Sequence, residues 1–89
     1  MKQEIKNLIQ KHYKNTVVDD IVVEGEELKD YEKCVIIKCH TRGQNLPKIA
    51  LRILNKYRDV RLVHFIGEWV EAVYTRETLK WFGYKVIEL

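Results

Sequence analysis

The spacing of apolar residues alternates between helical and strand-like periods along this chain of 89 residues. Apolar side chains recur at steps of three and four over residues 2–13 and 46–57, which predicts two amphipathic helices. β-Branched and aromatic residues predict four strands, at 17–24, 32–40, 60–66 and 69–74. The sequence therefore predicts a mixed α+β fold.

A third helix and a last strand are expected after the second pair of strands. Thr75 is typical of a helix N-cap and Gly83 of the left-handed residue that ends a helix. Residues 84–89 predict a final strand, which completes the order α-β-β-α-β-β-α-β. This order favours a single domain over 1–89, a two-layer sandwich with helices mainly on one face of a mixed sheet. From residue 32 onward, a ferredoxin-like core is the alternative topology.

The composition is that of a globular protein. It is 46% hydrophobic and 33% charged, with four glycines and one proline, which excludes a disordered or linker segment. No apolar run is long enough to cross a bilayer, and residues 1–6 lack the features of a signal peptide. We therefore expect a cytoplasmic protein with no membrane partner, and abundant Lys, Glu, Ile, Val and Tyr suit a thermophilic source.

Neither the cysteines nor the histidines predict a metal site. Cys34 and Cys39 lie five residues apart in one predicted strand, so their side chains point to opposite faces and cannot form a disulfide with each other. His12, His40 and His64 add no second pair of closely spaced ligands. We therefore expect two reduced thiols, no metal and no cofactor.

Charged residues are segregated into two neighbouring blocks of opposite sign. Residues 16–32, the acidic segment, hold seven acids and one lysine, whereas residues 38–61 hold seven bases and one aspartate. A domain whose bases cluster on one element has the electrostatic footprint of a polyanion binder. The acidic segment is then either an internal counterweight or a surface for a basic protein partner.

The predicted helix at 46–57 carries the centre of the basic block. Lys48, Arg52 and Lys56, the basic ridge, follow each other at four-residue steps opposite the apolar stripe. Like charges at that spacing cost the isolated helix about 0.2–0.5 kcal/mol per pair. The ridge thus favours a polyanionic partner such as a sugar-phosphate backbone, although a solvated helix face is the plain alternative.

Residues before this helix extend the candidate site. Lys38 lies in the second predicted strand, and Arg42-Gly43 precedes the helix, where a glycine lets backbone donors approach an anion. We therefore predict a protein that binds DNA or RNA through its phosphates. The candidate nucleic-acid-binding residues are Lys38, Arg42, Gly43, Lys48, Arg52 and Lys56.

The stretch from Val35 to Ala50 resembles the second strand, Arg-Gly turn and second helix of the Alba family of archaeal DNA- and RNA-binding proteins. The likeness covers about residues 34–66, in which strand, turn, basic helix and hairpin strand follow the family's order. It implies phosphate contacts from Arg42 and Lys48. The family's first strand is absent, and its long basic hairpin arm is replaced by a short acidic tip, so the resemblance does not imply gripping of the minor groove.

The tight turn between the third and fourth strands predicts an apolar face. Gly67-Glu68 is a two-residue loop with glycine first, which is typical of a type II′ hairpin and would pair Ile66 with Trp69. The same register would place His64 opposite Glu71. One face of this hairpin then forms a candidate interface of Leu62, His64, Ile66, Trp69 and Val73. Because a small domain rarely leaves a second apolar face in water, we expect a homodimer.

Two other functions compete with nucleic-acid binding. A protein-interaction module, such as an inhibitor or a complex subunit, would use the acidic segment or the apolar hairpin face. A small hydrolase would use His64 oriented by Glu71 as an acid/base pair. No serine or cysteine nucleophile, metal set or phosphate-binding fingerprint accompanies that pair, so we expect a binding protein without catalytic residues.

Overall fold

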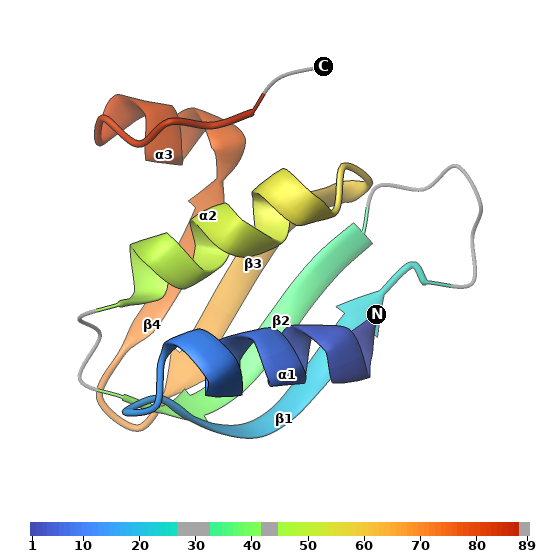
Figure 1. Cartoon of the computed structure of the whole chain (residues 1–89), viewed down its shortest axis with the longest axis vertical. Helices are drawn as coiled ribbons and strands as arrows, with labels where there is room; N and C mark the ends of the chain where they lie inside the picture. The colour runs from blue at the N-terminus through green and yellow to red at the C-terminus, as the bar shows by residue number, and fades with distance from the viewer. Residues whose placement is uncertain (27–32, 42–44, 88–89) are drawn as a thin grey trace.

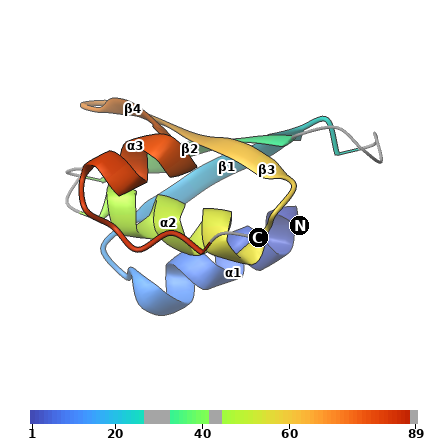
Figure 2. The ribbon, with the colours of Figure 1, turned by 90° about the horizontal axis from the view of Figure 1, so that it is seen from above.

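The computed structural model describes residues 1–26, 33–41 and 45–87. Within them the chain forms helices and strands in this order: α1 (Lys2–His12), β1 (Val17–Glu24), β2 (Lys33–His40), α2 (Leu46–Lys56), β3 (Val60–Gly67), β4 (Glu71–Thr75) and α3 (Arg76–Trp81). The strands form one four-stranded sheet, and all three helices lie on the same face of it (Figure 1, Figure 2). This arrangement confirms the predicted α+β two-layer sandwich. None of the helices in the described residues has the length and apolarity that a membrane crossing requires.

The sheet follows chain order, β1-β2-β3-β4. The pairs β1–β2 and β3–β4 are antiparallel, whereas β2 and β3 are parallel and are connected through α2. The sheet is therefore mixed, as predicted. The alternative ferredoxin-like topology is wrong, because it would place β4 between β2 and β3, and these two strands pair directly.

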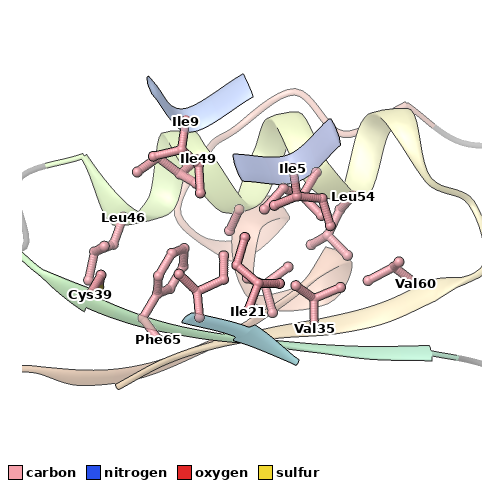
Figure 3. Close-up of a cluster of buried hydrophobic side chains, with 14 of the residues drawn as sticks. Ile5, Ile9, Ile21, Val35, Cys39, Leu46, Ile49, Leu54, Val60 and Phe65 are labelled. Atoms are coloured by element: carbon pink, nitrogen blue, oxygen red, sulfur yellow. The ribbon is translucent and has the colours of Figure 1, made fainter. Parts of the chain in front are cut away.

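The core lies between the helices and the covered face of the sheet (Figure 3). The predicted apolar stripe of α2 is confirmed, because five of its members are buried: Leu46, Ile49, Ala50, Ile53 and Leu54. They pack with Ile5 and Ile9 of α1 and with strand residues such as Phe65 in one buried cluster. Cys39 is buried in this core and Cys34 is half-buried on the opposite face, and both are free, as their spacing predicts.

The predicted last strand is wrong for the residues that the structure describes. Gly83 ends α3 with φ +86°, as expected, but residues 84–87 form no strand, and residues 88–89 lie outside the described part. Because β4 leads directly into α3 on the helical side, the chain after Gly83 is already far from a sheet edge and runs back beside α2 (Figure 2). The backbone N–H of Ile87 donates there to the side-chain oxygen of Asn55 at 2.9 Å.

The hairpin register also differs from the prediction. The N–H of Gly67 donates to the carbonyl of Val70 at 2.8 Å, so Glu68 and Trp69 occupy the tip of the turn and His64 lies opposite Val73. Gly67 does not have a positive φ; instead, a Cβ there would lie 2.9 Å from the carbonyl oxygen of Cys39 in β2. Glycine is therefore required for close approach of two strands, and not for a type II′ turn.

An ion pair between a buried lysine and a half-exposed aspartate lies at the start of the parallel strands. Lys33 Nζ donates to Asp59 Oδ2 at 2.6 Å, and the Lys33 side chain is only 8% exposed. The hydrogen bond from Lys33 holds the pKa of the Asp59 carboxyl below its usual value. The ion pair therefore contributes its full stability at any pH above the ordinary pKa of aspartate. This stability is lost as the pH falls through the lowered pKa of Asp59 in the folded protein.

We expect Asp59→Asn to lower the free energy of unfolding by about 1–3 kcal/mol, because it leaves the buried ammonium of Lys33 without a charged partner. Denaturant unfolding at neutral pH measures the loss, and the same titration at acidic pH should show a smaller difference between variant and wild type. The double variant Lys33→Met/Asp59→Asn is the control, since it removes the buried charge and should recover part of the stability. A single variant as stable as wild type would show that the pair contributes nothing.

Candidate functional site

Positive charge is concentrated on the helical layer. The three helices carry eight lysines and arginines against Glu4 and Glu77, whereas the four strands carry three against four acids. All three helices lie on one side of the sheet (Figure 2), so most of the positive charge of the described helices and strands lies in the helical layer. A polyanion would therefore be attracted to the helical side of the molecule.

The structure brings the three residues of the basic ridge together on the exposed side of α2. Arg52 Nε donates to the hydroxyl of Tyr13 at 2.9 Å, and its guanidinium lies 5.8 Å from the centre of that ring. Lys56 Nζ is 3.8 Å from the Glu4 carboxylate, an exposed and therefore weak ion pair. Lys48 is exposed and forms no ion pair with the described residues. The ridge thus keeps most of its positive charge.

Helix α1 adds one cationic group, Lys11, that was not predicted for the site. The helix lies beside α2 and runs in the opposite direction (Figure 1), which brings His12 close to Arg52 and places Lys11 and His12 in one hollow with Lys56. Desolvation, together with the charges of Arg52 and Lys11, holds the pKa of the His12 imidazole below its usual value. The sequence of α1 does not show which of its residues lie next to the basic ridge, because that depends on how α1 packs beside α2.

The acidic segment does not neutralise the ridge within the described residues. Asp20 lies 3.6 Å from the ammonium of Lys2, and Asp19 lies 2.6 Å from Nδ1 of His40. Glu26 lies 3.9 Å from the amino group of Met1. The described part of this segment thus contacts the start of α1 and His40, and it leaves the basic ridge exposed to solvent.

The predicted nucleic-acid-binding residues do not form one surface. Lys38 is exposed on the uncovered face of the sheet, where Asp20 and Ile66 are its cross-strand neighbours, and the basic ridge lies on the other side of the molecule. Arg42 and Gly43 lie outside the described residues. Only the three ridge residues are thus brought together, since β2 alternates between two faces and Lys38 belongs to the opposite one.

The uncovered face of the sheet carries a row of apolar side chains. Strand pairing aligns Val22, Ile36, His64 and Val73 across all four strands, and Cys34, Leu62 and Ile66 flank this row. We call these seven residues the open face. The predicted interface residues Leu62, His64, Ile66 and Val73 do lie together on it, because the hairpin moved its register by two residues and kept the same alternation. Val22 and Ile36 were missed, since the parallel pairing of β2 with β3 was not predicted.

Trp69, the fifth predicted interface residue, lies at the tip of the β3–β4 turn. Its side chain is 87% exposed and lines a cavity beside the end of the sheet. It is therefore at the margin of the open face.

His64 and Glu71 do form a hydrogen bond, although they are not directly opposite each other. His64 Nε2 lies 3.0 Å from Glu71 Oε1, a diagonal contact between β3 and β4. The sequence contains no serine, and the nearest free thiol in register, Cys34, is a neighbour of Leu62 on the adjacent strand. The described residues also hold no cluster of three or more metal-ligating side chains. The pair is therefore well explained as a cross-strand contact of the sheet.

No protein-family model, no curated protein and no solved structure matches this chain. The resemblance of residues 34–66 to the Alba family therefore stays a prediction from the sequence. The function has to be inferred from the surfaces that the fold creates.

Proposed function

We propose that this protein binds the phosphate backbone of DNA or RNA through its helical layer. The observation that carries this proposal is the concentration of positive charge on the helical layer. The basic ridge on α2 faces solvent together with Lys11 of α1, and Glu4 is its one acidic contact among the described residues. Lysines and arginines that neutralise phosphates release counterions, and this release drives binding without contacts to base edges.

Arg52 is the central residue of the proposed surface. The bond from its Nε to Tyr13 restricts the guanidinium, and its two terminal nitrogens have no hydrogen-bond partner in the described part of the chain. A guanidinium held in this way loses less conformational freedom when it binds a phosphate in the bidentate geometry that arginine favours. Lys56 can exchange its weak contact with Glu4 for a phosphate at little cost.

We expect Arg52→Glu to weaken the binding of duplex DNA roughly fivefold to tenfold at physiological salt, whatever its sequence. The plot of log affinity against log salt concentration should become shallower by about 0.9, the slope of one phosphate contact to B-form DNA. Fluorescence anisotropy with duplex DNA, single strands and structured RNA across a salt series measures both quantities.

Arg61→Glu is the matched control, because Arg61 is an exposed arginine of β3 outside the ridge. The same reversal of charge there should change affinity much less than Arg52→Glu does. Lys38→Glu tests the remaining predicted residue on the opposite side of the molecule. If Arg52→Glu binds as wild type does, or if Lys38→Glu is the more damaging change, the helical layer is not the binding surface.

A second proposal concerns the open face, and its occupant is a second copy of this chain. One whole side of the sheet is uncovered by helices, and Val22 and Val73 are 39% and 49% exposed within the apolar row. Among the aligned residues of that row, His64 has the one ring, so the face lacks the aromatic platforms that stack bases. An isologous dimer would cover both copies of the row and leave both helical layers outward, where two ridges raise avidity for one nucleic acid.

A further inference from the structure

A hollow of about 320 Å³ lies on the helical layer between α1 and α2. The two helices lie side by side there (Figure 1, Figure 2). A second hollow, of about 370 Å³, shares Leu8 and Lys56 with the first and is also lined by Arg52. The first hollow therefore borders directly on the basic ridge. It is lined by Glu4, Asn7, Leu8, Lys11, His12 and Lys56.

The end of this hollow at His12 is cationic. Glu4, the acid in its wall among the described residues, precedes His12 by eight positions in α1, which is about 12 Å along the helix axis. The Glu4 carboxylate lies 3.8 Å from Lys56 Nζ, so these two charges offset each other at the far end. The charges that act on His12 are those of Lys11 in α1 and Arg52 in α2. An anion at this end would thus meet two positive charges.

His12 is the member of this cluster whose charge changes near neutral pH. Its side chain is exposed, and it makes no hydrogen bond or ion pair with the described residues; the ring of Tyr13 lies 6.3 Å away. Desolvation and the charges of Arg52 and Lys11 hold the pKa of the imidazole below its usual value. The ring is therefore mostly neutral at pH 7 while no anion is bound.

A phosphate beside His12 would reverse the effect of its neighbours. The negative charge offsets the repulsion from Arg52 and Lys11 and favours the imidazolium, which has two donors. The last turn of α1, where His12 lies, also favours a cation because of the helix dipole. Arg52 and Lys11 attract the phosphate at any pH near neutrality, and His12 adds a contact once it carries a proton.

We infer that His12 is a further phosphate-binding residue of this surface, next to Arg52 and Lys11, and that it makes its contact by taking up one proton. The phosphate belongs to the sugar-phosphate backbone of the bound nucleic acid. This inference rests on the proposed function and deepens it, because it gives the helical layer a dependence on pH. The proton and the nucleic acid then strengthen each other's binding by the same factor.

Affinity for duplex DNA should rise as the pH falls through the pKa of His12 in the complex, and level off below the pKa of His12 in the free protein. We expect binding to tighten about threefold to fivefold between pH 7 and pH 5 at constant ionic strength. The plot of log affinity against log salt concentration should be steeper at pH 5 by about 0.9, the slope of one added phosphate contact. Fluorescence anisotropy measures both quantities.

Three variants assign this dependence to one ring. His12→Gln should lose the gain in affinity and the steeper salt dependence at pH 5. His12→Arg carries its charge at every pH, so it should bind at pH 7 as tightly as wild type does at pH 5 and gain no more on acidification. His40→Gln is the matched control, because His40 is an exposed histidine beside Asp19 and outside the hollow, and it should keep the pH dependence of wild type.

An NMR titration of the His12 ring measures the same linkage directly, and the pKa of this ring should be higher in the DNA complex than in the free protein. A pKa that does not rise, or a pH dependence that His12→Gln retains, would overturn the inference. If Arg52→Glu weakens DNA binding at pH 7 and the His12 variants show no difference in pH dependence, the proposed function stands and this inference is wrong. If Arg52→Glu binds as wild type does, both are wrong.

Discussion

Replacing Arg76 with methionine should destabilise the protein by about 2–4 kcal/mol, the largest loss of stability that we expect from one substitution outside the core. Arg76 is the first residue of α3, and its guanidinium donates to the carbonyl oxygens of Val60 at 2.5 Å, Leu54 at 2.7 Å and Tyr57 at 3.0 Å. These groups belong to the last turn of α2, the loop after it and the first residue of β3. One side chain therefore bonds to carbonyls at and just after the end of α2, and it joins α2, β3 and α3.

Thermal and denaturant unfolding measure this effect, and the midpoint of thermal unfolding should fall by about 8 °C or more in a domain of this size. Arg61→Met is the control, because Arg61 is exposed and has no hydrogen bond to the described residues, so its loss should matter little. Arg76→Lys should lie between the two, since an ammonium can reach fewer of the three carbonyls. If Arg76→Met has the same unfolding midpoint as wild type, the guanidinium contributes nothing to stability, and the prediction is wrong.

Replacing Val73 with lysine should convert a dimer into a monomer. Val73 ends the apolar row of the open face on the edge strand β4 and is 49% exposed in the single chain, so the substitution should not disturb the core. In the proposed dimer, the new ammonium would be buried without a partner, which raises the dissociation constant about 100-fold or more. Sedimentation velocity at micromolar concentration distinguishes the two states.

Ile87→Lys is the matched control for that experiment. Ile87 is 55% exposed and its backbone bonds to Asn55 on the helical side of the molecule, so the same change from an aliphatic residue to lysine should leave the dimer intact. A wild type that sediments as a monomer at these concentrations would contradict the proposal. If both Val73→Lys and Ile87→Lys dissociate the dimer, the dimer contact is not confined to the open face.

Features that depend on local periodicity were determined by the sequence. The apolar stripe of α2 is buried as its spacing of three and four requires, and the basic ridge is exposed on the opposite side. Alternation within β3 and β4 placed Leu62, His64, Ile66 and Val73 on one face even though the turn was wrong by one position. A register change of two residues preserves alternation, which is why the face was predicted and the pairing was not.

Features that depend on contacts between distant residues were decided only by the tertiary structure. The parallel pairing of β2 and β3 aligns Ile36 with His64, creates the cavity at their shared ends and requires a glycine at position 67. The contact of α1 with α2 brings Tyr13 to Arg52, and the fold of α3 brings Arg76 to the end of α2. The spacing of residues along one element carries no information about which element lies beside it, because that choice is made by the packing of the whole core.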